Sequence, residues 1–302
     1  MPRIALFSTE CAQLGDALET IIERHHDDIA VVVTSDVYAT SRGGLLKQTC
    51  RNIRRSGLGF MTYLTYSFML YPAAVLADRL LAPLRSGRRT RRSVAELCRA
   101  HGIEYMKTGN VNSPAVVSKL EEADLDFIVI YWFDQILRER VIAAPKRAVI
   151  NVHAAFLPHC RGLFPTLFSA LEPGTPFGIS AHLIENREID AGPVLAQRVA
   201  VPPPGRSVLF NDSWVNRTGV GMLDEILADF DGFLEVATPQ PEGGSYYSYP
   251  ERHHLAQARR HGLKLVTLRD FVAVVRGTGA SDSDGHRPEP RRTQPTGTSH
   301  LE

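Results

Sequence analysis

The sequence predicts an α/β fold in which helices cover both faces of a Rossmann-like, doubly wound and mostly parallel sheet. Three features predict it: a β-α-β pattern opens the chain, strands and helices alternate up to about residue 230, and the run Phe127–Trp132 is apolar on both faces. A strand with two apolar faces is typical of the centre of a parallel sheet. The connections are too long for hairpins, which also favours parallel pairing. In such sheets, ligands bind beyond the carboxyl ends of the strands.

The individual elements follow from changes in hydrophobic periodicity. Ile4–Phe7 is a short apolar run, residues 14–22 carry apolar side chains at helical spacing, and Ile29–Thr34 is rich in β-branched residues. After the segment 36–92, the expected elements are a helix at 93–101, a strand at 103–106, a helix from 113, strands at 127–132 and 148–153, a helix at 163–171, strands at 178–184 and 194–201, and helices at 207–230 and 268–275.

Residues 36–92 interrupt the alternation and predict a mostly helical insertion. Within it, Gly59–Ala77 carries no charge and is long enough to cross a bilayer. Pro72 and several hydroxyl-bearing side chains argue against stable membrane insertion and favour a buried hairpin or lid. A peripheral membrane contact stays open, and the apolar content is compatible with a homodimer. The closing arginine-rich run, Arg85–Arg92, is more typical of a solvated linker than of a contact with RNA.

Composition excludes several classes of protein. The 302 residues are 44% hydrophobic and carry a net charge of +1, so no overall field would attract nucleic acid or an acidic membrane. The four cysteines are far apart, which is typical of free thiols in a reducing cytoplasm, and the start of the chain has no secretory signal pattern. No metal-ligand cluster, nicotinamide fingerprint, P-loop or nucleophile elbow occurs, so neither a metal nor a nucleotide cofactor is expected.

Candidate catalytic groups collect at the end of one strand. Asn151 and His153 share a face of the strand at 148–153, at the edge where α/β sheets bind ligands. His182 lies on the following strand, and Asp190 lies in the loop after it. Asn can donate to a developing oxyanion, His can move a proton near neutral pH, and Asp can fix the imidazole tautomer. Taken alone, an Asn-x-His at a strand end is more often a capped turn than a catalytic pair.

Two longer segments decide between these interpretations. INVHAAFLPHCRG, at Ile150–Gly162, and GISAHLIENREIDAGPVLAQ, at Gly178–Gln197, resemble the folate-dependent formyltransferase family. That family includes the glycinamide ribonucleotide, methionyl-tRNA and amino-sugar N-formyltransferases. The shared pattern is Asn-x-His-x-x-x-Leu-Pro followed by a histidine, seven further residues and Asp-x-Gly. One departure is Ala154-Ala155, where many members have Pro-Ser.

The resemblance implies roles for these residues. Asn151, His153 and Asp190 take the catalytic positions: Asn151 and a protonated His153 would stabilise the oxygen of the formyl group, and Asp190 would keep His153 charged. It also implies a pterin pocket lined largely by backbone, with His182 beside the aspartate. The residues expected to bind the folate are Gln135, Ile136, Leu137, Ile142, His182, Asn186, Arg187, Glu188 and Ile189.

The function expected from the resemblance is N-formyl transfer from 10-formyltetrahydrofolate to a primary amine of a small metabolite, such as an amino sugar nucleotide, an amino acid or a biosynthetic intermediate. The alternatives are a 10-formyltetrahydrofolate hydrolase, in which water replaces the amine, and an enzyme like methionyl-tRNA formyltransferase. The tRNA alternative is disfavoured because the last hundred residues do not suggest an added β-barrel domain. The expected domains are a catalytic domain at 1–230, a small extension at 231–278 and a disordered tail at 279–302.

Overall fold

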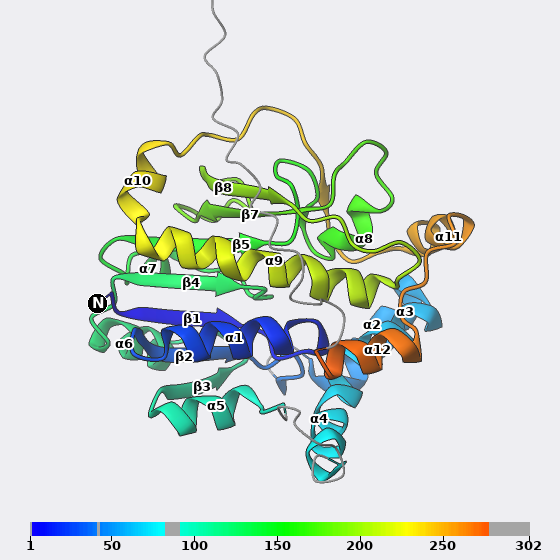
Figure 1. Cartoon of the computed structure of the whole chain (residues 1–302), viewed down its shortest axis with the longest axis horizontal. Helices are drawn as coiled ribbons and strands as arrows, with labels where there is room; N and C mark the ends of the chain where they lie inside the picture. The colour runs from blue at the N-terminus through cyan, green and yellow to red at the C-terminus, as the bar shows by residue number, and fades with distance from the viewer. Residues whose placement is uncertain (1, 41–42, 82–90, 278–302) are drawn as a thin grey trace, which may run out of the picture.

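The computed structural model describes residues 2–40, 43–81 and 91–277. Its centre is a seven-stranded sheet with the strand order β3-β2-β1-β4-β5-β7-β8 (Figure 1). The strands are β1 (Ile4–Ser8), β2 (Ile29–Ser35), β3 (Glu104–Thr108), β4 (Phe127–Tyr131), β5 (Ala148–His153), β7 (Gly178–Leu183) and β8 (Val194–Val199). The first five strands in this order, β3-β2-β1-β4-β5, pair in parallel. Strand β7 is antiparallel to both of its neighbours, β5 and β8. The predicted fold class, a doubly wound and mostly parallel sheet, is confirmed.

Helices cover both faces of the sheet because its strands alternate apolar side chains between them. Ile4 and Leu6 pack with helices α1 (Gly15–His25), α5 (Val94–His101) and α9 (Val208–Ala228). Ala5 and Phe7 face the opposite way, toward α6 (Pro114–Glu122) and α7 (Glu139–Ile142). The central β4 is buried along its whole length, as its two apolar faces predict.

The described part of the insertion is mostly helical, as expected. After the short 3₁₀ turn η1 (Ala12–Leu14) and strand β2, it consists of α2 (Gly44–Ser56), α3 (Leu58–Leu64), a π-helical turn η3 (Thr65–Met69) and α4 (Leu70–Leu81). Figure 1 shows these helices beyond the carboxyl ends of β1 and β2. Phe60, Tyr63 and Tyr71 anchor them in a separate apolar cluster with α8 (Pro165–Ser169), α11 (Arg252–Arg260) and α12 (Leu268–Val275).

One helical stretch of the described chain, Leu58–Leu81, passes the length and composition criteria for a membrane span. A third of its most apolar window is buried inside the protein. Those buried side chains belong to the core described above, and a core helix of a soluble protein meets the same criteria.

Two predicted helices differ from the observed ones. The helix expected at 163–171 spans only Pro165–Ser169, because Phe164 has a positive φ of 55° and Pro165 starts the helix. The helix expected at 207–230 ends at Ala228, where the side chain of Asp229 accepts from the Gly232 amide and begins α10 (Phe230–Glu235). The predicted tail at 279–302 lies outside the described residues, as does all of Arg85–Arg92 except Arg91 and Arg92.

The segment after α10 packs back onto the sheet. Thr238 pairs with Val194 at the start of β8. Farther along, β9 (Tyr246–Tyr247) forms a two-stranded parallel sheet with β6 (Arg161–Gly162), which lies in the loop after β5. The proposed extension at 231–278 therefore contacts the loop that carries the predicted site.

Candidate active site

Strand β5 presents the two predicted catalytic side chains at its carboxyl end. Asn151 and His153 are each 8% exposed and lie on one face of the strand. In the antiparallel neighbour β7, His182 lies directly opposite Asn151, and Ser180 lies opposite His153. Ser180 accepts from the Leu157 amide and donates to the Ala155 carbonyl, which fixes the loop after His153.

Asp190 reaches this pair from the loop between β7 and β8. Its φ is 49°, in the left-handed region, and its Oδ2 accepts from the Gly162 amide at 2.8 Å. Two glycines make this approach possible. A Cβ at Gly162 would lie 2.1 Å from the Tyr247 carbonyl oxygen, and one at Gly192 would lie 2.0 Å from the Leu183 carbonyl oxygen. The glycine of the Asp-x-Gly pattern thus lets the loop pack directly on β7.

The two ring nitrogens of His153 have different surroundings. Its Nε2 lies 3.0 Å from the carbonyl oxygen of Cys160. A carbonyl only accepts, so Nε2 carries a proton. Nδ1 lies 3.7 Å from Oδ2 of Asp190, too far for a direct hydrogen bond but close enough for strong ionic attraction. Nδ1 is therefore the ring atom available to exchange a proton with a ligand.

Asn151 directs its amide nitrogen into the protein. Nδ2 donates to Oδ1 of Asp190 at 3.0 Å and lies 3.0 Å from Nε2 of His182. His182 donates from Nδ1 to the Leu183 carbonyl at 2.9 Å, and its Nε2 lies 3.4 Å from Oδ1 of Asp190. A protonated ring donates from Nε2 to Asp190, whereas a neutral ring accepts there from Asn151, so that both amide hydrogens of Asn151 have partners. In the neutral case, Asn151 must exchange one of these two bonds to donate to an oxyanion, as the sequence predicts.

The surroundings of Asp190 keep it ionised. Burial by itself would raise the pKa of this carboxyl, but His153, His182 and the Gly162 amide outweigh burial and hold the pKa well below its ordinary value. Asp190 is thus a fixed negative charge beside two imidazoles. It can favour a proton on His153 without taking up that proton itself.

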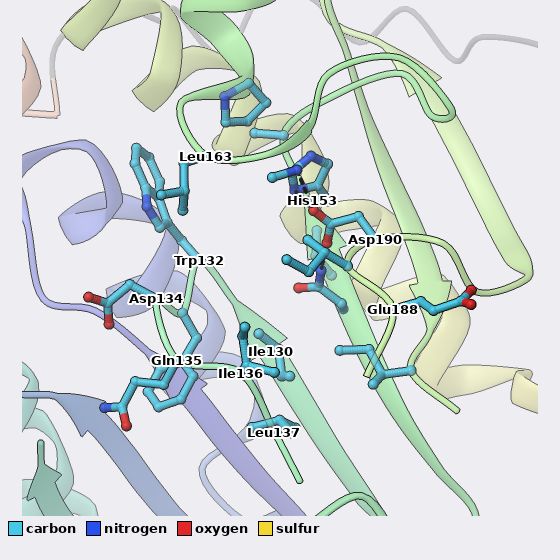
Figure 2. Close-up of a pocket in the computed structure, with 18 of the residues that line it drawn as sticks. Ile130, Trp132, Asp134, Gln135, Ile136, Leu137, His153, Leu163, Glu188 and Asp190 are labelled. Carbon is cyan, nitrogen blue, oxygen red and sulfur yellow. Dashed lines mark hydrogen bonds and ion pairs between the residues drawn. The ribbon is translucent and has the colours of Figure 1, made fainter. Parts of the chain in front are cut away.

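A cavity of about 270 Å³ opens beside these groups. Figure 2 shows His153 and Asp190 on one wall and Trp132, Asp134 and Gln135 on the opposite wall. The predicted residues that line it are Asn151, His153, Gln135, Ile136, Leu137, Asn186, Arg187, Glu188, Ile189 and Asp190.

Two residues predicted to bind the folate do not line this cavity. His182 is fully buried and supports Asn151 and Asp190 from behind, because it lies one strand farther along the sheet. Ile142 packs at the end of α7 against the apolar layer under β4. Neither residue lines this cavity, and their part in binding a folate stays a prediction.

Gln135 lines the cavity but its side chain is engaged elsewhere. Its Nε2 donates to Ser35 and to the Thr108 carbonyl, and its Oε1 accepts from the Val111 amide. The loop after β4 is therefore fixed to the loops after β2 and β3. The polar atoms of the Gln135 side chain are thus already engaged by protein groups.

Several residues of the site are not indicated by the sequence patterns. Trp132 and Asp134 follow the central strand β4 at the ligand-binding edge, a position that could have marked them. No sequence pattern marks Gln240 as a residue of the site. It donates to the carbonyls of both Asp190 and Gly192 at 2.8 Å and accepts from Arg161, so it fixes the Asp190 loop from fifty residues away.

The cysteine nearest the site is not activated. Burial raises the pKa of the Cys160 thiol to about 12, so it is not a thiolate nucleophile. Cys160 contributes its backbone carbonyl to His153 instead. Among the residues that the structure describes, no group of His, Cys, Asp and Glu side chains is arranged to hold a metal ion.

Comparisons with known proteins agree with this geometry. The profile of the family described as "Formyl transferase" matches residues 74–203. A methionyl-tRNA formyltransferase of Trichlorobacter lovleyi is 27% identical over 155 residues, which cover 51% of this chain and 49% of that protein. Another, of Finegoldia magna, is 35% identical over 95 residues, or 32% of this chain and 30% of that protein. The chain thus spans about half or less of the length of these curated relatives.

A solved structure shows the same fold. Glycinamide ribonucleotide transformylase 1 of Symbiobacterium toebii superposes with a TM-score of 0.50 at 14% identity, covering 77% of this chain and 88% of that one. The matched profile includes β4, β5, β7 and β8 and hence Asn151, His153 and Asp190. The matched segment thus resembles the formyl transferase family, and the superposition shows the shared fold.

Proposed function

We propose that the protein is an N-formyltransferase that moves a formyl group from 10-formyltetrahydrofolate to a primary amine of a small metabolite. The observation that carries the proposal is the convergence of Asn151, His153 and Asp190 on one wall of a cavity, within the segment that matches the family profile. These three groups supply what acyl transfer requires without a covalent enzyme intermediate: a hydrogen-bond donor, a proton carrier and a fixed negative charge.

The cavity suits a flat, hydrogen-bonding ring. Its walls combine apolar side chains, such as Ile130, Ile136 and Leu137, with the backbone of the loops 133–137 and 186–190. At about 270 Å³ it can enclose a bicyclic head group, while the rest of a folate would extend outside. Ile136 is 58% exposed at the rim, where such an extension would pass.

The reaction joins the acceptor nitrogen to the formyl carbon and breaks the bond from that carbon to the donor nitrogen, so the acceptor nitrogen loses one proton and the donor nitrogen takes one up. His153, protonated at Nδ1, stabilises negative charge on the formyl oxygen and can deliver a proton to the departing nitrogen. Asp190 stabilises the charged imidazole at 3.7 Å. Asn151 adds a second donor when it exchanges its bond to Asp190 or His182. Each well-placed donor contributes roughly 3 kcal/mol to stabilising the transition state.

Calorimetric titration with 5-formyltetrahydrofolate, a stable stand-in for the donor, tests the donor assignment. We expect micromolar binding by the wild-type protein. Ile136→Glu should abolish binding because it places a charge at the apolar rim of the cavity. The matched control is Leu268→Glu, which changes an exposed residue at the start of α12. Folded wild-type protein that does not bind, or an Ile136→Glu variant that binds normally, would contradict the assignment.

Turnover then separates the alternative reactions. Incubation with 10-formyltetrahydrofolate, with and without a library of amines, reports release of tetrahydrofolate. Release that requires an amine supports the transferase. Release at full rate in water alone supports the hydrolase, and release only with charged initiator tRNA supports the tRNA alternative.

A further inference from the structure

The helical stretch Leu58–Leu81 has a buried side and an exposed side. Phe60, Tyr63 and Tyr71 are 1%, 2% and 3% exposed and pack into the apolar cluster with α8, α11 and α12. The exposed side includes positions three, four or seven residues apart, which is the spacing of one helix face. These positions are Leu58, Thr62, Met69, Ala73 and Leu76. We refer to these five residues as the apolar stripe.

The apolar stripe is unusual for a solvent-facing surface. Leu58 is 72% exposed and Leu76 is 56% exposed, and the run Gly59–Ala77 contains no charged residue. Only a third of the most apolar window of the stretch is buried inside the protein. The solvent side of a surface helix ordinarily carries charged residues. A contiguous exposed apolar surface of this kind marks a site of interaction.

Basic side chains lie next to the stripe on α2. Lys47, Arg51 and Arg54 are exposed, and Arg54 precedes Leu58 by four residues. Helix α2 contains no acidic residue. The net charge of the whole chain is only +1, so the positive charge of this region is a local feature.

Helix α11 enlarges the basic region. Ser56, at the end of α2, donates to the Pro250 carbonyl, and Arg252 of α11 donates to the Ile53 carbonyl at 3.5 Å. Figure 1 shows α2, α3, α4 and α11 at the same end of the molecule. The exposed basic residues of α11 are Arg252, Arg259 and Arg260. Among the described residues, neither these three nor the three of α2 form an ion pair with a carboxylate.

The combination of stripe and basic region favours one kind of partner. An anionic bilayer offers negative head groups for arginine and lysine, and an acyl boundary for leucine and methionine. RNA would offer phosphates but nothing apolar for the stripe. A second copy of the chain, in a two-fold contact through this patch, would bring the same arginines against one another.

We propose that the apolar stripe and the six basic side chains of α2 and α11 dock the protein onto an anionic lipid bilayer. Helix Leu58–Leu81 lies in the plane of the interface and does not cross it, because its other side stays packed on the core through Phe60, Tyr63 and Tyr71. The proposal is independent of the proposed function, since it uses none of the groups assigned to formyl transfer.

Flotation of the full chain with lipid vesicles tests the proposal. One set of vesicles contains equal parts of phosphatidylglycerol and phosphatidylcholine, and the other contains phosphatidylcholine alone. We expect the anionic vesicles to bind the protein at least tenfold more tightly. Added salt should weaken this binding, because it screens the attraction between arginine and the head groups.

Two variants with matched controls assign the surface. Leu58→Ser/Leu76→Ser should weaken binding to anionic vesicles at least tenfold. Leu234→Ser/Val236→Ser is its control, since both residues are exposed at α10, which Figure 1 shows at the opposite end of the molecule.

Arg54→Glu should weaken the same binding at least fivefold, because it reverses one charge of the basic region. Its control is Arg138→Glu at the start of α7, where an exposed arginine also has no ion pair among the described residues. All of these positions are exposed, so circular dichroism should show that every variant is folded. Both controls should bind anionic vesicles as the wild type does.

Each outcome supports or overturns the proposal. Folded wild-type protein that ignores anionic vesicles, or that binds both kinds of vesicle equally, overturns it. Tighter binding to a single-stranded RNA, unchanged in Leu58→Ser/Leu76→Ser, would assign the basic region to nucleic acid. A wild-type dimer that becomes monomeric in this variant and binds no vesicles would assign the stripe to a second copy. Equal losses in a variant and its control would place the bilayer contact elsewhere.

Discussion

Asp190 links the groups on which the proposed chemistry depends. It accepts from Asn151 and Gly162 and lies between two histidines. Its backbone has a positive φ, which asparagine tolerates better than most residues. Asp190→Asn is therefore a substitution that removes the charge while the backbone keeps its conformation.

We expect Asp190→Asn to fold normally, to bind 5-formyltetrahydrofolate, and to lose at least a hundredfold in kcat, because His153 loses the charge that stabilises its protonated form. Circular dichroism and calorimetry control for folding and binding, and steady-state kinetics give the result. Turnover at the wild-type rate would remove Asp190 from the mechanism.

Asp212 makes stability depend on pH. This side chain of α9 is buried and accepts from the hydroxyl of Tyr63 at 2.6 Å. Burial raises its pKa to about 7, and the bond from Tyr63 opposes only part of that shift. In the unfolded chain an aspartate titrates near 3.9. The folded protein therefore holds this proton more tightly, so its stability falls as pH rises from about 4 to 7 and is constant above that range.

Asp212→Asn should abolish this part of the pH dependence, since an amide does not titrate. Between pH 5 and pH 8 we expect the wild-type free energy of unfolding to decrease by roughly 1–3 kcal/mol more than that of the variant. Urea unfolding at the two pH values measures the difference. The same decrease in both proteins would show that Asp212 does not titrate in this range.

At the scale of elements, Arg91 fastens the end of the insertion to the core. Its side chain is 7% exposed and pairs with Asp16 at 2.6 Å and Glu19 at 3.0 Å on α1. It also donates to the Val275 carbonyl at the end of α12. The sequence favours a solvated linker for the arginine-rich run, whereas Arg91, a member of that run, is buried in the structure.

Arg91→Met should destabilise the protein by about 3 kcal/mol, because Glu19 loses its partner at 3.0 Å and Asp16 keeps only Arg217, at 2.9 Å. Arg92→Met is the matched control: Arg92 is adjacent, 32% exposed and paired with Glu23, so the expected loss is below about 1 kcal/mol. Denaturant unfolding compares the two variants. Equal losses would show that the contacts of Arg91 add no more to stability than an exposed ion pair does.

At the scale of the whole molecule, the sequence predicted what depends on local periodicity. The strands follow from short apolar and β-branched runs, and the shared face of Asn151 and His153 follows from the period of two along a strand. The contact of Asp190 with this pair could be expected only through the family resemblance. The catalytic roles of all three residues remain predictions.

Hydrophobic periodicity does not predict contacts between residues that are far apart in the sequence. The packing of the insertion on the turn after β1 includes a hydrogen bond from Gln13 to Tyr63, fifty residues away, and the Asp190 loop is held by Gln240. Neither pair leaves a periodic signal, because each contact is made by the packing of a loop against another element. His182 shows the complementary case: it belongs to the pattern that resembles the family, and the register of β7 with β5 places its buried side chain opposite Asn151.

The segment after residue 230 should be required for activity. A chain of residues 1–277 is expected to bind 5-formyltetrahydrofolate like the full chain. A chain of residues 1–230 should lose binding at least tenfold, because it lacks Gln240 and β9, which hold the Asp190 and Gly162 loops. Calorimetry on both proteins, after circular dichroism, measures this. Normal binding by a folded 1–230 chain would show that the catalytic domain ends where the sequence suggested.

The pairing of β6 with β9 also sets an order of events during synthesis on the ribosome. The loop at Arg161–Gly162 leaves the ribosome long before Tyr246–Tyr247, its partner strand. The central sheet can form while translation continues, but the amide of Gly162 gains its final support only after the later strand has emerged. A nascent chain therefore contains all seven strands of the central sheet before it can complete this site.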